Sequence, residues 1–279
     1  MPAPQRIAVI TFNDIPPRNP TFKYLVLGQL ALENRRSWCG RHGYDLIETV
    51  PIARDRPACW AKIPAILAAF ETHDWVLWAD SDTLVAEPDA RIEPFLDPGR
   101  DMVVQLHERF DRHVGLSPEE GRRRMPINTG VFLMRATDWA RDFLRRTYEQ
   151  TQFVTRGPVW DGIGEQEAMI RLLRARPRDR RRIRYVAGLQ NHPALYRPGD
   201  LSIHFYGNYA RNRIAPAACA EVIDRWRRAV AGGGPLPPDR ARFHWCVIQN
   251  RIADAAVQRG DLDHYLYQPA DIAAPESAP

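Results

Sequence analysis

Short apolar runs alternate with amphipathic helical patterns along the first half of this chain. Residues 6–11 and 75–79 are nearly continuous apolar runs, which are typical of buried strands, and residues 44–49 form another strand pattern. Between these runs, residues 21–42 and 62–70 carry apolar side chains at helical spacing. Strands that alternate with helices predict an α/β fold, with a doubly wound, mainly parallel sheet flanked by helices.

The alternation continues through the next part of the chain. Residues 101–106 and 128–135 have strand patterns, and residues 137–150 and 165–173 have helical patterns. Residues 201–207 form a late strand pattern that ends in a polar loop. These elements extend the predicted sheet and its covering helices.

Composition places the domain boundaries. We expect one α/β domain over residues 1–230, followed by a linker of glycine and proline over residues 231–238. A helical segment is predicted over residues 239–268, and residues 269–279 have the composition of a disordered tail. A chain of 279 residues is long enough to bury the core that such a domain needs.

Composition also indicates the cellular compartment in which the protein is expected. No apolar run approaches the roughly 20 residues that span a bilayer, and the first residues show no secretory signal. The four cysteines have no CxxC spacing, which argues against a disulfide scaffold or a zinc site. These observations predict a cytoplasmic protein.

The basic charge of the chain comes almost entirely from arginine, because Lys23 and Lys62 are the only lysines. The densest run, residues 174–184, lacks interleaved aromatic residues and follows a helical pattern. We therefore interpret it as a solvated helix end and loop rather than a nucleic-acid patch, and expect no nucleic acid partner. A peripheral contact with anionic lipid, at the inner face of the membrane, is the alternative use of this charge.

The strand pattern at residues 75–79 ends in two carboxylates, Asp80 and Asp82. Ligands of parallel α/β sheets sit beyond the carboxyl ends of strands, and side chains at i and i+2 share a face. Two such carboxylates can bind Mg²⁺ or Mn²⁺ with open positions left for phosphate oxygens. The alternative is a solvated turn or a helix cap, which the preceding apolar strand makes less favourable.

Four further segments stand in a fixed order along the chain. Residues 60–66 read WAKIPAI, residues 127–135 INTGVFLMR, residues 164–173 GEQEAMIRLL and residues 203–208 IHFYGN. With these segments in this order, residues 7–208 resemble the glycosyltransferase family of galactomannan galactosyltransferases, xyloglucan xylosyltransferases and fungal α-1,6-mannosyltransferases.

The resemblance implies a GT-A fold and a divalent-metal-dependent glycosyltransferase that retains the anomeric configuration of the sugar. It also implies a nucleotide-sugar donor, UDP-hexose or UDP-pentose in preference to a GDP-sugar. The acceptor would be a hydroxyl group of a glycan or glycolipid. A bacterial enzyme of polysaccharide biosynthesis agrees with the expected cytoplasmic location.

By this resemblance Asp80 and Asp82 are the metal-binding Asp-x-Asp motif, and His204 completes the metal site. Neutral imidazole suits manganese as well as carboxylate does, so Mn²⁺ or Mg²⁺ is the expected cofactor. By itself His204 would be interpreted as a core histidine with satisfied hydrogen bonds. Its place at a late strand end, before a loop that contains glycine, favours the role of ligand.

The resemblance assigns Trp60, Lys62, Asn128, Thr129 and Gly130 to the binding of the donor. Asparagine can donate to and accept from sugar hydroxyls, and glycine lets a ligand approach the backbone closely. The alternatives are an ordinary first-turn helix residue for the lysine, and a turn into the following strand for the Asn-Thr-Gly segment.

The resemblance places Gln166 near the reacting sugar carbon. Glu165 stands where the family usually has aspartate, and its side chain is longer by one methylene group, which displaces the carboxylate at a reaction centre where geometry matters. Asp161, four residues earlier, is the alternative carboxylate. The acidic start of a helix is the alternative interpretation for the whole segment.

Arginines after His204 are candidates for the diphosphate. Family members often carry a lysine in this loop, whereas this chain has Arg211 and Arg213, which suit bidentate phosphate contacts or are solvated loop charges. The predicted substrate-binding set is completed by four polar residues: Thr11, Asn13, Ser81 and Asn208.

Retention of configuration leaves two mechanisms open. In one, the leaving group departs and the acceptor attacks on the same face; in the other, Glu165 or Asp161 forms a covalent intermediate.

Two other classes of protein remain as alternatives. A sugar nucleotidyltransferase would need a Gly-rich phosphate loop after the first strand, but residues 11–20 contain no glycine. A non-catalytic nucleotide-sugar-binding protein would explain the departure at Glu165.

Overall fold

The computed structural model describes eight stretches of the chain: residues 5–12, 25–49, 56–87, 89–106, 127–154, 164–191, 197 and 199–205. These residues belong to two compact units that alternate along the chain. The first unit comprises Met1–Phe12, Gly43–Asp80 and Ile92–Leu189, and the second comprises Asn13–His42, Ser81–Arg91 and Gln190–Pro279. The predicted linker, C-terminal helical segment and tail, residues 231–279, lie outside the described residues.

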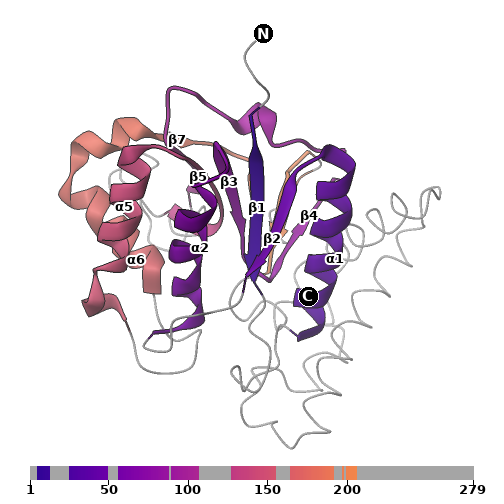
Figure 1. Ribbon diagram of the computed structural model, residues 1–279, viewed down its shortest axis with the longest axis horizontal. Helices are drawn as coiled ribbons and strands as arrows, with labels where there is room; N and C mark the ends of the chain where they lie inside the picture. Colours follow the sequence, from indigo (N-terminus) through magenta and orange to yellow (C-terminus); the bar gives the residue numbers. More distant parts are fainter. Residues whose placement is uncertain are drawn as a thin grey trace, which may run out of the picture. The chain divides into compact units, whose positions relative to one another are not determined.

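The first unit is built on a six-stranded sheet with the order β2-β1-β3-β6-β5-β7 (Figure 1). The strands are β1 (Ile7–Phe12), β2 (Asp45–Thr49), β3 (Trp75–Ala79), β5 (Met102–Leu106), β6 (Ile127–Arg135) and β7 (Ile183–Tyr185). β1 runs parallel to β2 and β3, and β5 runs parallel to β7, whereas β6 is antiparallel to both of its neighbours. The predicted α/β fold with a mainly parallel sheet is confirmed, with β6 as the strand that breaks the pattern.

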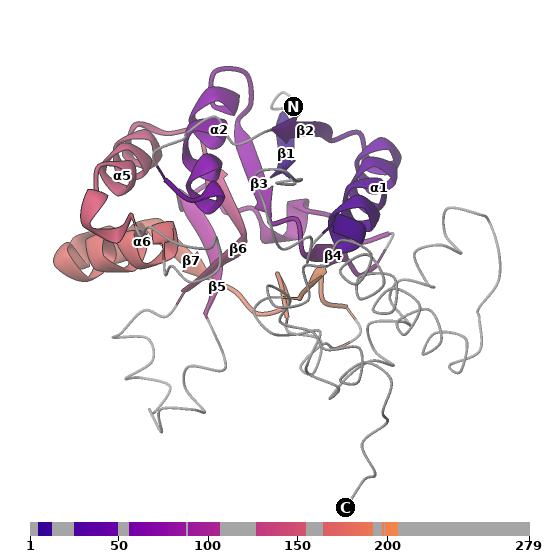
Figure 2. The same cartoon turned by 90° about the horizontal axis from the view of Figure 1, so that it is seen from below.

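The reversed direction of β6 brings its first residues beside the end of β3. Ala79, the last residue of β3, is opposite Val131, so the three residues before Val131 extend past the end of β3. The backbone N–H of Asp80 donates to the carbonyl oxygen of Gly130 over 2.8 Å. Figure 2 shows β3 and β6 side by side. The Asp-x-Asp motif and the Asn-Thr-Gly segment therefore begin from neighbouring strand ends.

Three helices cover one face of this sheet: α2 (Lys62–Ala69), α5 (Asp138–Tyr148) and α6 (Gly164–Ala175) (Figures 1 and 2). In α5, Thr137 caps the first turn by accepting a hydrogen bond from the N–H of Ala140. The buried positions of α5 are Ala140, Phe143, Leu144 and Thr147, the spacing of one helical face. The three apolar ones, Ala140, Phe143 and Leu144, pack with α2, α6 and the strands into one apolar core.

The second unit is a smaller assembly of α1 (Leu25–His42), β4 (Thr83–Val85) and β8 (Ser202–His204). β4 and β8 pair antiparallel, with Thr83 directly opposite His204. The side chain of Asn34 in α1 bonds to the backbone of β4 as a neighbouring strand would. It accepts from the N–H of Val85 over 2.7 Å and donates to the oxygen of Val85 over 3.2 Å. Buried Arg35 donates to the oxygen of Thr83 over 2.7 Å. These contacts hold the strand that directly follows Asp82.

The predicted strands and helices between residues 6 and 205 are present, and their observed ends lie within two residues of the expected ones at all but two places. The part of the first helix pattern before Leu25 lies outside the described residues, and the late strand ends at His204, three residues before its expected end. The short strands β4 and β7 were not expected. After the end of α6, the arginine-rich run forms a 3-10 helix over Pro177–Arg182 where a loop was predicted, and Arg176, Arg178 and Arg181 are exposed. Among the described helices, none combines the length and the apolar character that crossing a bilayer requires.

Removal of one core side chain tests this packing. Ile66 of α2 is fully buried in the core of the first unit. We expect Ile66→Ala to lower the free energy of unfolding by about 2–5 kcal/mol, because buried methyl groups are lost and a cavity remains. Urea unfolding followed by circular dichroism measures the change. The exposed Arg145→Ala of α5 is the control and is expected to change the free energy by less than about 0.5 kcal/mol; equal effects of the two variants would contradict the assigned core.

Candidate active site

The apolar strand β3 delivers its first carboxylate in a fixed orientation. All five residues of β3 are buried, and Asp80 follows with about a quarter of its side chain, 27%, exposed. The indole N–H of Trp78 donates to Oδ1 of Asp80 over 2.6 Å. Because the backbone N–H of Asp80 is also bound, to Gly130, both the main chain and the carboxylate are held at the end of the strand.

Lys62, at the start of α2, is the buried centre of a charged cluster in the first unit. Its Nζ lies 2.5 Å from Oε1 of Glu165, 3.3 Å from Oδ1 of Asp80 and 3.1 Å from the carbonyl oxygen of Thr129. An ammonium group has three N–H donors, so these contacts use its hydrogen-bonding capacity. Lys62 therefore links α2, β3, β6 and α6 at one point.

The electrostatic balance of this cluster keeps Lys62 charged. Burial disfavours the ammonium form, but the attraction of Asp80 and Glu165 outweighs it and raises the pKa of Lys62 above its ordinary value. Burial, reinforced by the charge of Glu165, raises the pKa of the neighbouring Cys59 thiol well above its ordinary value. These surroundings keep Cys59 a neutral thiol.

The residues predicted to contact the sugar and the reaction centre lie together. The N–H of Thr129 donates to Oε1 of Gln166 over 2.9 Å, and its hydroxyl lies 3.2 Å from Oε1 of Glu165 and 3.3 Å from Oε1 of Gln166. Asn128 accepts from the N–H of Gly130 over 2.9 Å, which is a turn-like contact. The start of β6 and the start of α6 thus form one polar cluster.

A glycine permits α6 to begin at this place. Gly164 has a φ of +54°, and a Cβ there would lie 3.0 Å from Sγ of Cys59. Any other residue would have both a strained backbone and a close contact. Gly164 therefore sets the position of Glu165 and Gln166.

The second unit contributes a carboxylate and an imidazole. Oδ1 of Asp82 lies 3.3 Å from Nε2 of His204, and both side chains are buried. The N–H of Phe205 donates to the carbonyl oxygen of Asp82 over 2.9 Å. On the other side of the ring, Nδ1 of His204 lies 2.9 Å from Oε1 of Gln190.

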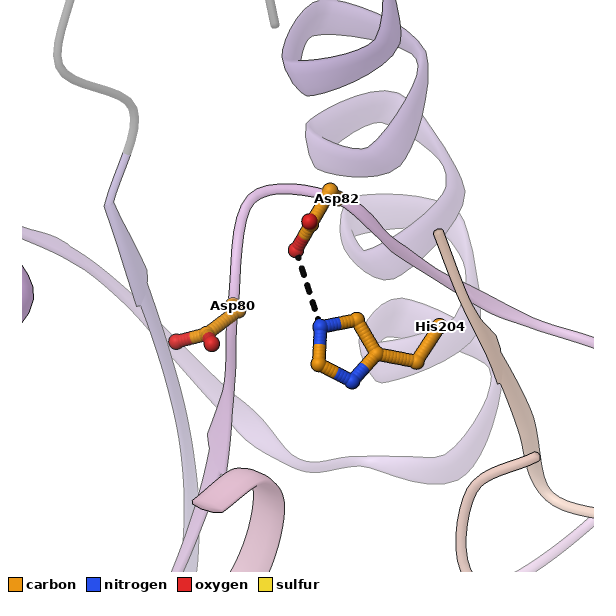
Figure 3. Close-up of side chains that lie close together, drawn as sticks. All are labelled: Asp80, Asp82 and His204. Atoms are coloured by element: carbon orange, nitrogen blue, oxygen red, sulfur yellow. Dashed lines mark ion pairs between the residues drawn. The ribbon is translucent and has the colours of Figure 1, made fainter. Parts of the chain in front are cut away.

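Asp80, Asp82 and His204 form a group that can hold a metal ion, as Figure 3 shows. One ligand atom from each of the three lies within 4.8 Å of the others. The two carboxylates and one imidazole match the donor atoms that Mn²⁺ accepts, and the low exposure of Asp82 and His204 excludes a merely solvated turn. The residues therefore fit the predicted divalent cation.

The remaining predicted site residues divide into two sets. Trp60 is fully buried and packs edge-on against Tyr148, Thr11 is buried within β1, and Ser81 is half-buried, so their contact with substrate stays a prediction. The other set lies outside the described residues: Asn13, Asp161, Asn208, Arg211 and Arg213.

Two residues of the site were not found from the sequence. The indole of Trp78 orients Asp80, but an aromatic residue in an apolar strand pattern looks like core alone. Gln190 contacts His204, and its place in an irregular segment carried no recognisable signal.

Replacement of the buried cation tests the charged cluster. We expect Lys62→Met to lower the free energy of unfolding by about 3–5 kcal/mol, because two carboxylates are left without their counter-charge. Lys62 remains charged in the folded chain up to its raised pKa, so the loss is expected throughout about pH 7 to 9 and would shrink only as pH rises through that pKa. Urea unfolding provides the measurement.

The double variant Lys62→Met/Glu165→Gln is the control for this test. It removes one of the uncompensated charges, so it should be more stable than the single Lys62→Met variant. If the two effects are simply additive and unfavourable, the ion pair between Lys62 and Glu165 does not exist in solution.

Comparisons with known proteins find similarity to glycosyltransferases. Residues 3–115 match the model of the galactosyl transferase GMA12/MNN10 family. A probable glycosyltransferase 6 of Oryza sativa is 29% identical over 150 residues, which are 50% of this chain and 28% of the relative. An uncharacterized alpha-1,2-galactosyltransferase of Schizosaccharomyces pombe is 24% identical over 250 residues, 77% of this chain and 63% of the relative. The chain thus spans less than a third of the rice protein and under two thirds of the yeast one.

A solved structure supports the fold. A glycosyltransferase involved in the glycosylation of the major capsid of PBCV-1 matches with a TM-score of 0.53 and 19% identity, over 72% of this chain and 93% of that protein. The resemblance predicted from the sequence is confirmed: residues 3–115 match the galactosyl transferase GMA12/MNN10 family model, and the described residues have the GT-A glycosyltransferase fold.

Proposed function

We propose that this protein is a metal-dependent, retaining glycosyltransferase. It transfers a hexose or pentose from a nucleotide sugar, UDP-linked by analogy with the family, to a hydroxyl group of a glycan or glycolipid. The observation that carries the proposal is the group of Asp80, Asp82 and His204, in which the two carboxylates follow the buried strand β3 and the imidazole ends β8. The family match and the GT-A fold support the same reaction class.

Asp80, Asp82 and His204 would hold Mn²⁺ or Mg²⁺. When bound there, the cation supplies Lewis-acid stabilisation of the charge that develops on a diphosphate leaving group. Trp78 and Lys62 hold one oxygen of Asp80, so this carboxylate enters the site already oriented. Preorganised groups of this kind cost little rearrangement during the reaction.

Gln166 is the residue best placed to contact the sugar of the donor. Thr129 fixes its amide oxygen, and its side chain is only partly buried. Its amide NH₂ has no hydrogen-bond partner among the described residues, and can donate to a sugar hydroxyl or to the ring oxygen. Holding a substrate in one orientation in this way lowers the entropic part of the barrier.

Glu165 positions the cluster rather than attacking the sugar. It is only 4% exposed, and its Oε1 contacts both Lys62 and Thr129. Such pairing stabilises the carboxylate and lowers its nucleophilicity. We therefore favour the same-face mechanism: the bond from the anomeric carbon to the diphosphate breaks, a bond to the acceptor oxygen forms, and the acceptor proton passes to the departing diphosphate.

Loss of one metal-binding charge tests the function. We expect Asp82→Asn to reduce turnover of the correct nucleotide sugar at least about 100-fold, since several kcal/mol of charge stabilisation is lost. Release of nucleotide from a panel of UDP- and GDP-sugars with Mn²⁺ identifies the donor and measures the rate. Chelation of the metal should have the same effect.

The exposed Asp89→Asn is the matched control, because Asp89 lies in the same unit and pairs with Arg41. It should leave turnover unchanged. Wild-type turnover by Asp82→Asn, or in excess chelator, would show that the metal assignment is wrong.

The role of Glu165 has a separate test. We expect Glu165→Ala to lower turnover by up to about 100-fold through loss of positioning, and added azide to produce no glycosyl azide. A covalent mechanism through Glu165 predicts otherwise, since azide would occupy the vacated space and attack the donor from the opposite face. Accumulation of a glycosyl azide of inverted configuration, detected by mass spectrometry and NMR, would establish Glu165 as the nucleophile.

A further inference from the structure

Gln190 lies behind the histidine of the candidate metal group. Its side-chain oxygen Oε1 is 2.9 Å from Nδ1 of His204, while Nε2 of the same ring is 3.3 Å from Oδ1 of Asp82. Gln190 is 2% exposed and His204 is 4% exposed, so bulk water does not compete for this contact. The two ring nitrogens therefore have separate partners, one on each side.

The partner on Nδ1 determines what Nε2 can do. A neutral imidazole carries one proton, and it binds a metal through the nitrogen that lacks this proton. When the Gln190 oxygen accepts from Nδ1–H, the lone pair is on Nε2, the nitrogen that faces Asp82. If the Gln190 amide were reversed, its NH₂ group would donate to Nδ1, and Nε2 would carry the proton and be unable to bind metal.

The backbone around Gln190 is held by β8, the strand that carries His204. Asn191 forms a parallel bridge with Ile203: its N–H donates to the oxygen of Ser202 over 3.0 Å, and its oxygen accepts from the N–H of His204 over 2.9 Å. The side chain of Asn191 donates to Asp200 over 2.7 Å. The residue after Gln190 is thus fixed to the histidine's own backbone, which sets the distance between the two side chains.

We propose that Gln190 is a positioning residue of the metal site: its side-chain oxygen holds the proton of His204 on Nδ1, which leaves Nε2 unprotonated and able to bind the cation. The inference rests on the proposed metal-dependent function. It assigns Gln190 no contact with metal or substrate. Groups that accept from a metal-binding histidine typically change metal affinity about 10- to 100-fold when removed.

The test measures Mn²⁺ binding directly. Gln190→Met keeps the length of the side chain and removes the carboxamide, whereas Gln190→Glu keeps an oxygen acceptor. Calorimetry with a nucleoside diphosphate present gives the Mn²⁺ affinity, and electron spin-echo spectroscopy of bound Mn²⁺ detects an imidazole nitrogen ligand. We expect Gln190→Met to weaken binding about 10- to 100-fold and to lose the nitrogen signal, and Gln190→Glu to retain it.

Trp38→Phe is the matched control for loss of a buried hydrogen-bonding group in the same unit. It removes the hydrogen bond that the indole N–H donates to the carbonyl oxygen of Ala90 over 2.8 Å, eight residues after Asp82. It should lower the melting temperature without altering Mn²⁺ affinity or the nitrogen signal. Comparison with it separates an effect on His204 from general destabilisation.

The outcomes distinguish this inference from the proposed function. If the wild-type protein binds no Mn²⁺, the proposed metal site itself fails. If wild type shows a nitrogen-ligated Mn²⁺ that His204→Ala lacks, while Gln190→Met keeps full affinity and signal, the metal site stands and the role of Gln190 is wrong. Should Gln190→Met fail to fold, loss of the nitrogen signal in Gln190→Glu overturns the inference equally.

Discussion

The buried ammonium group of Lys62 is the interaction on which the site of the first unit depends. It joins Glu165 from α6, Asp80 from the end of β3 and the backbone of Thr129 from β6. Removing a lysine from water is unfavourable, and only close contacts with several acceptors offset that cost. The consequence is geometric, because three elements far apart in sequence must meet around one nitrogen.

The direction of β6 makes this arrangement attainable. In a fully parallel sheet, the neighbours of β3 would end where β3 ends. The first residues of the strand in the place of β6 would then lie at the other end of the strands, away from Asp80. Because β6 is antiparallel to β3, its first residues lie beside Asp80, and the oxygen of Gly130 accepts from the N–H of that residue. The Asn-Thr-Gly segment is then within reach of the first turn of α6. Because β6 is reversed, the end of β3 lies beside the beginning of β6 and close to the beginning of α6.

Much of the first unit could be predicted because its strands and helices have strong periodic patterns. The five buried residues of β3, followed by Asp80, form a pattern that predicts a strand with a candidate functional residue at its end. Three-residue strands such as β4 and β7 have too few residues for a pattern, and their positions come from partners distant in sequence. The antiparallel pairing of β6 is likewise a tertiary property. The roles of Gln190 and Trp78 were not predicted, because they depend on which atom of each side chain faces a partner. The type of residue alone does not determine this.

The two aspartates of the motif are positioned by different means. Asp80 closes the first unit and Asp82 lies in the second, so each is oriented by the partners of its own unit. Asp80 contacts Lys62 and Trp78, whereas Asp82 faces His204 and accepts from the backbone of Phe205. Their spacing of two residues keeps the carboxylates near one another through the covalent chain itself. Each carboxylate of the motif is therefore oriented by its own set of hydrogen-bonding and charged partners.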